Sequence, residues 1–199
     1  MQYKYATVKD FKDIAALHMR AFKGFFLTSL GNEFLETYYK SCLKDNETIS
    51  IIAVNENSDI TGFCIGCMKS KGFHKKLIKR NMLPFFFQGI KALINNPKTI
   101  IRLVRNLDKN STSTDDGNYN ELLSIAVSPA SKSMGVGKEL ILKYEEEAIK
   151  RQCKKIALTT DYYNNDDVIG FYKKMGYTPL CDFISYPNRR MYKLIKEII

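Results

Sequence analysis

The sequence predicts an α/β fold built on one mixed β-sheet, and three features indicate it. Across residues 121–186 strand-like and helix-like segments alternate, which is typical of strands joined by helical crossovers. Two further strand pairs, within residues 49–68 and 177–195, are separated by short polar turns, and such hairpins are antiparallel. The chain has 199 residues, 45% of them apolar, which is enough for a single domain with a proper core.

The first 68 residues are expected to form a strand, two helices and a hairpin. The first strand alternates in polarity, and Asp10 can cap the helix that follows it. Gly31 precedes a second stretch whose apolar residues recur with helical spacing. A polar turn at residues 55–59 then separates two strands. The expected segments are 3–8, 10–22, 32–43, 49–54 and 60–68.

The middle of the chain is strongly basic. Residues 69–109 contain eleven Lys or Arg and a single acid, Asp108, so this segment carries the whole net charge of +10. We interpret it as a basic insertion over about 69–118, interrupted at Pro84, with a second helix-like piece at 99–107 and a polar loop at 108–118. Such an asymmetry favours an anionic partner. The alternative is a solvated basic face over a helix pair that packs on the core.

The last third has the clearest boundaries. Strands are expected at 121–127 and 155–160, each followed along the chain by a helix, at 135–150 and 165–175. Two closing strands at 177–186 and 190–195 surround Pro187-Asn188.

Two glycines, Gly135 and Gly137, stand where the first of these helices begins. The first N–H groups of a helix have no internal partner, and the helix dipole places partial positive charge there. Glycine lets an anion approach these amides without a Cβ in the way. The segment therefore suits a phosphate group, although two glycines can also simply begin a helix.

Other phosphate-binding loops do not match. A Walker loop would need Ser or Thr after Gly137-Lys138, and Glu139 follows instead. A dinucleotide fingerprint would need a third glycine where Leu140 stands.

The wider pattern resembles the GNAT superfamily of N-acetyltransferases. Ile125-Ala126-Val127-x-Pro129, followed by Lys132-x-x-Gly135-Val136-Gly137 and Leu140, resembles its motif A. Asn165-x-x-Val168-x-x-Phe171-Tyr172-x-x-x-Gly176-Tyr177 resembles its motif B. Together the motifs cover about a third of the chain. This sequence departs from the family pattern at three positions, namely Lys132 in place of Arg or Gln, Ser133 in place of glycine and Val168 in place of alanine.

The resemblance implies a GNAT fold over residues 1–199, with a mostly antiparallel sheet, two parallel strands that splay apart, and helices on both faces. It implies acetyl-CoA as the cosubstrate, with its pyrophosphate on the amides of residues 133–138 and its pantetheine arm along residues 125–127. Asn165 and Phe171 would line the far wall. The implied cofactor-binding residues are Ile125, Ala126, Val127, Lys132, Ser133, Met134, Gly135, Val136, Gly137, Lys138, Asn165 and Phe171.

Acetyl transfer from a thioester to an amine needs a base, an oxyanion donor and an acid for the departing thiolate. Tyr172 matches the general-acid tyrosine of the family, and the backbone N–H of Val127 could serve the oxyanion. Glu121 is the first candidate for the base, with Asp161 second and His18 third. Each has a structural alternative: a packed aromatic for Tyr172, a solvated strand-end carboxylate for Glu121, and a structural histidine for His18.

Metal chemistry and a membrane span are not expected. Cys64 and Cys67 are three residues apart in a strand and should point to opposite faces of the sheet, where we expect ordinary buried cysteines. No nearby cluster supplies further zinc ligands. The scattered cysteines, and an N-terminal segment without the apolar stretch of a secretory signal, predict a cytoplasmic protein.

The acceptor is less defined by the sequence. The first hypothesis is a small primary amine. The apolar connector at residues 21–31 loosely resembles bacterial GNAT proteins of surface-polysaccharide synthesis, which implies an amino sugar, for instance on an anionic sugar nucleotide. The second hypothesis is a protein or peptide N-acetyltransferase, and the third a non-catalytic CoA-binding module. Peripheral contact with an anionic membrane and a homodimer stay open, whereas the absence of a base-reading motif argues against nucleic acid.

Overall fold

The computed structural model describes residues 1–95 and 115–198. These residues form a seven-stranded sheet in the order β1-β2-β3-β4-β5-β7-β6. All neighbouring strands are antiparallel except β4 and β5, which are parallel. The strands are β1 (Gln2–Tyr5), β2 (Thr48–Val54), β3 (Ile60–Cys67), β4 (Asn120–Val127), β5 (Lys155–Asp161), β6 (Thr178–Ser185) and β7 (Arg189–Glu197). The predicted α/β fold with a mixed, mostly antiparallel sheet is confirmed.

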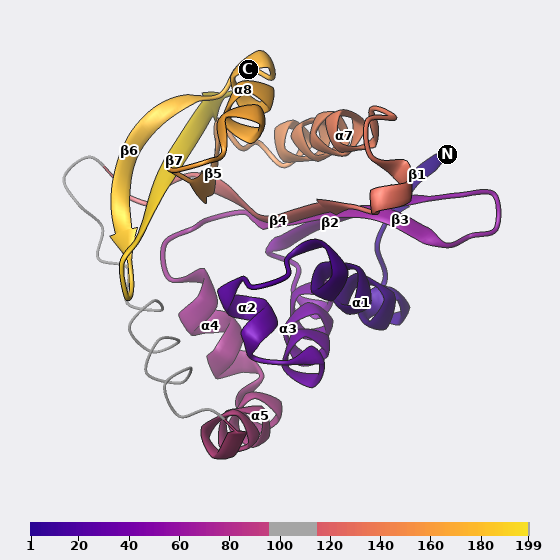
Figure 1. Ribbon diagram of the computed structural model, residues 1–199, viewed down its shortest axis with the longest axis vertical. Helices are drawn as coiled ribbons and strands as arrows, with labels where there is room; N and C mark the ends of the chain where they lie inside the picture. Colours follow the sequence, from indigo (N-terminus) through magenta and orange to yellow (C-terminus); the bar gives the residue numbers. More distant parts are fainter. Residues whose placement is uncertain (96–114, 199) are drawn as a thin grey trace.

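Helices cover both faces of the sheet (Figure 1). One face carries the first five helices, and the other carries α7 and α8. The first group is α1 (Phe11–Ala21), α2 (Phe26–Ser29), α3 (Asn32–Lys44), α4 (Phe73–Arg80) and α5 (Met82–Asn95). The second is α7 (Val136–Lys150) and α8 (Asp166–Lys174). Two short 3-10 turns, at Val8–Asp10 and Pro129–Ser131, precede α1 and α7.

The two helical layers bury separate apolar clusters against opposite sheet faces. On one face α1 and α3 contribute Leu17, Leu35 and Tyr39, which pack with Phe63 and Ile65 of β3. On the other face α7 contributes Leu140, Ile141 and Tyr144, which pack with β2, β4 and β5. Strands in the middle of the sheet are apolar on both sides because both sides are covered. Cys64 belongs to the second cluster and Cys67 to the first, as their spacing predicts.

Three details differ from the sequence-based expectations. The first strand ends at Tyr5, because the chain turns into the 3-10 segment at Val8. The apolar connector contains the short helix α2. Pro84 does not interrupt the insertion, since it lies in the first turn of α5 and the break falls at Asn81. A proline is tolerated there because the first helical N–H groups have no internal partner. The helix expected at 99–107 lies outside the described residues.

No described helix is long and apolar enough to cross a membrane.

Candidate active site

The parallel strands β4 and β5 separate after only three paired positions. Their register joins Asn120 to Ile156, Glu121 to Ala157 and Leu122 to Leu158, and goes no further. The opposite edge of β4 pairs with β3 as far as Val127. The predicted splay is therefore confirmed, and the second half of β4 has a strand partner on one side only.

A bulge in β4 lies at the point of separation. On β3, Ile65 is paired with Ser124 and the next residue, Gly66, with Leu122, so Leu123 is the extra residue of β4. An extra residue bends its strand and increases the local twist. This explains why β4 departs from β5 directly after Leu122 and leaves backbone groups of residues 124–127 facing the opening.

The turn before α7 is exposed and preformed. Ser133 and Gly135 both have positive φ, 65° and 77°, and a Cβ on Gly135 would meet no atom within 4 Å. The Glu139 N–H donates to the Gly135 carbonyl at 3.0 Å, so the amides of residues 136–138 come before the first internal bond of α7. Gly137 lies beside β4, because a Cβ there would be 3.6 Å from Cγ2 of Val127. The turn thus offers open amides at the end of the splayed strand.

Tyr144 of α7 contacts the start of β4 and so fixes this helix against the sheet. Its hydroxyl hydrogen-bonds the side-chain oxygen of Asn120 and lies 3.4 Å from the Glu121 carbonyl oxygen. The hydroxyl occupies the space of a missing side chain, since a Cβ on Gly66 would lie 1.8 Å from it. Sequence reasoning missed this contact, although Gly66 inside a strand pattern is a recognised signal of close approach.

On the α7 side of the gap, α8 contributes the predicted motif residues. Tyr172 is 7% exposed and packs in the cluster that includes Ile125 and Val127, as does the partly buried Phe171. Burial, and to a smaller extent the nearby Cys64, raises the pKa of Tyr172 above its ordinary value of 10.0. Its hydroxyl therefore stays protonated at neutral pH and can donate a proton or hydrogen bond.

Asn165 does not point away from the protein, because its side chain ties α8 to the end of β5. Its amide nitrogen donates to Thr160 Oγ1 at 2.7 Å and to the Asp161 carbonyl at 3.0 Å. The other predicted cofactor-binding side chains on the turn, among them Lys132, Met134 and Lys138, are exposed. Val136 is the buried exception and faces the second cluster.

Glu121 lies on the opposite face of the sheet from Tyr172. It pairs with Cys67, whose side chain belongs to the α1 and α3 cluster. Its carboxylate is buried and accepts a hydrogen bond of 2.5 Å from Ser70, at the start of the basic insertion. It is therefore not the solvated strand-end carboxylate of the alternative interpretation.

A buried ionic cluster borders Glu121 on the same face. The ammonium of Lys193 donates to Asp115 and to the Tyr119 hydroxyl, both at 2.6 Å. Burial and hydrogen bonding to Asp115 raise the pKa of Tyr119, and the charge of Glu121 contributes. This cluster joins the end of the insertion to β7, and sequence reasoning did not anticipate it.

Asp161 and His18, the other two base candidates, are already engaged. Both Asp161 oxygens accept from the Arg189 guanidinium at 2.5 Å, and that guanidinium also lies 4.3 Å from the centre of the Phe25 ring. Burial lowers the pKa of His18 from 6.5 to about 4. The His18 Nδ1 hydrogen-bonds Tyr39 at 2.6 Å, and the Tyr39 hydroxyl donates to Ser124 at 3.2 Å. The Asp161 carboxylate is thus occupied by a permanent cation, and an imidazole that resists protonation is a poor base.

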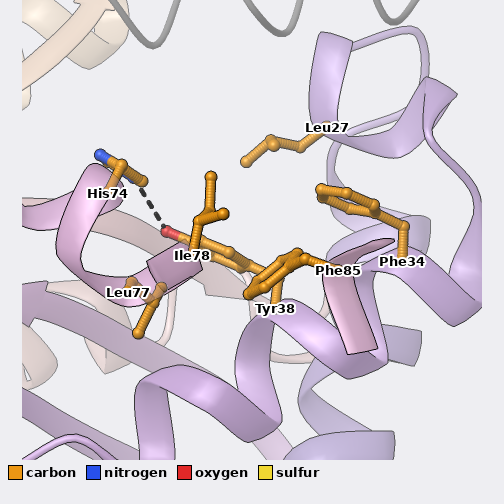
Figure 2. Close-up of a pocket in the computed structure, with 7 residues that line it drawn as sticks. All are labelled: Leu27, Phe34, Tyr38, His74, Leu77, Ile78 and Phe85. Atoms are coloured by element: carbon orange, nitrogen blue, oxygen red, sulfur yellow. Dashed lines mark hydrogen bonds between the residues drawn. The ribbon is translucent and has the colours of Figure 1, made fainter. Parts of the chain in front are cut away.

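A small cavity elsewhere is separate from this arrangement (Figure 2). It has a volume of about 40 Å³, and its lining is almost entirely apolar, with a 3.3 Å hydrogen bond between Tyr38 and His74 at its edge. The lining residues come from α2, α3, α4 and α5, namely Leu27, Phe34, Tyr38, His74, Leu77, Ile78 and Phe85. That volume is close to what one water occupies, so the cavity is too small for a substrate.

Comparison with known proteins agrees with this geometry. The sequence matches the acetyltransferase (GNAT) family model over residues 11–177. No match was found among curated proteins.

Among solved structures, the fold is similar to ribosomal-protein-alanine N-acetyltransferase from Brucella melitensis, with 12% identity, a TM-score of 0.64 and 100% of both chains covered. It is similar to Naa20 of Chaetomium thermophilum in complex with a bisubstrate analogue, with 14% identity, a TM-score of 0.62 and coverage of 100% of this chain and 87% of the other. It is also similar to aminoglycoside 6'-acetyltransferase type Ii, with 14% identity, a TM-score of 0.61 and coverage of 100% and 98%.

Proposed function

This chain belongs to the acetyltransferase (GNAT) family, and we propose that it transfers an acetyl group from acetyl-CoA to the primary amine of a small molecule. The observation that carries the proposal is the opening between β4 and β5, which lies beside the exposed turn before α7. An extended thioester arm needs an unpaired strand edge, and a pyrophosphate needs free amides. Both features adjoin here, because Gly137 packs against Val127 at the end of β4.

We assign the pyrophosphate to the turn before α7. The amides of residues 133–138 would hold it, with Lys132 and Lys138 adding positive charge at the surface. The pantetheine arm would pair with the backbone of Ile125, Ala126 and Val127 along the free edge of β4. Phe171 and the α8 N-terminus near Asn165 would close the other side.

We assign the general acid to Tyr172 and the general base to Glu121. The Tyr172 hydroxyl is protonated at neutral pH and packs in the cluster with Ile125 and Val127, from where it would donate to the departing thiolate. Glu121 lies on the other face of the same sheet, at the second-last position where β4 pairs with β5, so the acid and the base would approach the start of the gap from opposite faces. The base would take the proton that the acceptor amine loses as it attacks. Asp161 and His18 are less suited, for the reasons of charge and burial given above.

A small acceptor is supported by the contact between Phe25 and Arg189. This contact joins the connector before α2 to the start of β7, and Arg189 in turn grips Asp161 at the end of β5. A peptide that approached the end of β5 past this contact would have to separate these segments. The basic character of the insertion favours an anionic amine, of which an amino sugar on a nucleotide is our first choice.

A protein or peptide acceptor is the second candidate. Two of the similar structures are named as acetyltransferases of a ribosomal protein and as Naa20, whereas a third is named for aminoglycosides. Amine acceptors of very different size are thus found on the same fold, and fold alone does not select among them.

Calorimetric titration with acetyl-CoA tests the first step, with coenzyme A and adenosine monophosphate as comparison ligands. We expect binding in the micromolar range, with the pyrophosphate needed for most of it. Absence of binding up to millimolar concentration would reject the assignment of the turn and the gap.

Release of free thiol, followed across a panel of amines, tests the second step. Turnover with amino sugars or their nucleotides supports the proposal, and turnover with peptides alone would replace it by the second candidate. Binding of acetyl-CoA without turnover on any amine would make the protein a non-catalytic module. We propose a cytoplasmic enzyme over residues 1–199, and sedimentation equilibrium decides between a monomer and a homodimer.

A further inference from the structure

The helix α5 exposes a row of large apolar side chains. Met82, Leu83, Phe86, Phe87 and Ile90 are 65%, 71%, 61%, 64% and 42% exposed. Their spacings of three and four residues place them on one side of the helix. We call these five residues the apolar stripe.

The apolar stripe is not part of the hydrophobic core. Phe85, between its members, is buried and packs against Phe34 of α3 with ring centres 5.8 Å apart. That contact anchors α5 to the rest of the fold and turns the stripe outward. Single exposed apolar residues are common on protein surfaces, but five on one helix face mark a binding surface.

A basic stripe adjoins the apolar one. On α4, Lys75, Lys76, Lys79 and Arg80 are exposed and share one side by the same spacing, while Phe73 and Leu77 face the core. The chain passes from Arg80 to Met82 through one residue, so the basic stripe ends two residues before the apolar stripe begins. Residues 69–95 contain seven Lys or Arg and no acid. In Figure 1 α5 lies at the end of the molecule farthest from α7 and α8, and α4 lies between α5 and the sheet.

Some of this charge is neutralised by α3 and the residues after it. Arg80 forms ion pairs with Asp45 at 2.7 Å and with Glu47 at 2.9 Å, and Lys76 lies 3.5 Å from Glu47. Lys79 has no ion-pair partner among the described residues and is exposed. A net positive charge therefore remains beside the apolar stripe.

We propose that α4 and α5 dock on an anionic membrane surface, with the apolar stripe lying in the interface and the basic stripe against the lipid headgroups. An anionic membrane can bind both stripes at once. The apolar rings would enter the boundary between headgroups and acyl chains, and the cations would remain at the charged surface. A second copy of this chain would instead bring two basic stripes close together. The 14 residues of α5 span about 21 Å, which is shorter than the hydrocarbon core, so the helix lies along the surface.

Vesicle co-sedimentation with the full chain tests the proposal. The probes are phosphatidylcholine vesicles and mixed vesicles of phosphatidylcholine and phosphatidylserine, at low and at high salt. We expect binding to the mixed vesicles only, and a loss of binding as salt screens the charges. Equal binding to both vesicle types, or binding to neither, would overturn the proposal.

Three variants separate the contributions. Phe86→Ser with Phe87→Ser should weaken partition by about tenfold or more, because two rings leave the interface. Lys79→Gln should weaken it by about fivefold, the effect of one cation near an anionic surface. The control is Ile149→Ser on α7, where a residue that is 44% exposed lies outside the stripe and its loss should leave partition unchanged.

Circular dichroism verifies that each variant is folded. Sedimentation equilibrium without lipid examines the competing occupant, a second copy. A dimer that dissociates in the Phe86→Ser and Phe87→Ser variant would assign the stripe to that copy and overturn membrane docking. Vesicle binding needs no acetyl-CoA, so the two proposals are tested separately. Membrane docking can fail while acetyl transfer is observed, and acetyl transfer can fail while membrane docking is observed.

Discussion

The hydroxyl of Ser70 donates a hydrogen bond of 2.5 Å to the carboxylate of Glu121. Ser70 is the second residue of the basic insertion, and Glu121 stands on β4 two residues before the bulge at Leu123. The bond orients a buried carboxylate on the face of the sheet opposite Tyr172. It also connects the insertion physically to the strand on which acetyl transfer is proposed to occur.

Glu121→Gln should lower kcat by about 100-fold or more, because the amide cannot accept the proton of the amine. The KM for acetyl-CoA should change little, since the carboxylate lies away from the pyrophosphate turn. Ser70→Ala is the matched variant, and we expect a smaller loss because the base stays present but less well oriented. Steady-state thiol release measures both. Equal activity of Glu121→Gln and the unaltered enzyme would transfer the base role to another group.

Tyr172→Phe should lower kcat by about 10-fold to 100-fold while calorimetric affinity for acetyl-CoA is retained. Burial raises the pKa of Tyr172, so the rate should not decline through ionisation of its hydroxyl until the pH is well above 10. Tyr177→Phe is the control, since its ring centre lies 5.8 Å from that of Tyr172 and no catalytic role is proposed for it. Unchanged turnover in Tyr172→Phe would remove the acid assignment.

Gly137→Asp should separate stability from binding. A carboxylate in the first turn of α7 interacts favourably with the helix dipole, so the free energy of unfolding should be equal or higher by about 0.5 kcal/mol. The same charge would repel a pyrophosphate, and we expect the Kd for acetyl-CoA to rise at least about tenfold. Gly137→Ala provides the comparison, because its methyl group fits 3.6 Å from Val127. Chemical unfolding and calorimetry measure the two effects, and normal affinity in Gly137→Asp would place the pyrophosphate elsewhere.

His18 should make the protein less stable in mild acid. Its pKa is lowered from 6.5 to about 4, so below pH 6.5 the unfolded chain binds the proton first. The stabilisation is complete above pH 6.5 and is lost as the pH falls toward 4. Between pH 7 and pH 5 this amounts to a decrease of about 2 kcal/mol in the free energy of unfolding. Urea unfolding of the protein and of His18→Gln at both pH values measures it, and the same decrease in the variant would contradict the assignment.

Gly66→Ala should destabilise the fold by about 3 kcal/mol, because its methyl group would meet the Tyr144 hydroxyl at 1.8 Å and the Glu121 carbonyl at 2.5 Å. Adding Tyr144→Phe removes the contact with the hydroxyl, whereas the ring carbon Cζ at 2.6 Å and the Glu121 carbonyl at 2.5 Å remain, so the double variant should recover only a small part of the loss. Gly89→Ala is the control, since a Cβ there meets nothing within 4 Å and alanine is the better helix former. Thermal unfolding gives the order of the four proteins.

Local patterns in the sequence predicted the parts of the site that short segments build. The turn at Gly135 and Gly137 is one of these, since positive φ and open amides depend on a few neighbouring residues. The motif on α8 is another, because helical spacing determines that Tyr172 faces the sheet. The expected break at Pro84 is wrong because the effect of a proline depends on where the helix begins. The helix α5 begins two residues before Pro84, so this proline lies in the first turn, where it is tolerated.

By itself, then, the sequence determined the α/β class, the phosphate-suited turn and the identity of Tyr172 and Glu121 as candidates. Only the tertiary structure decided that Ser70 hydrogen-bonds Glu121, which is 51 residues away in the sequence. The same holds for the ion pair of Arg189 with Asp161 and for the Tyr144 hydroxyl that fills the space beside Gly66. The tertiary structure also decided that the apolar residues of α5 face outward. Propensities and caps act over a few residues, whereas strand register and helix packing determine which distant side chains meet.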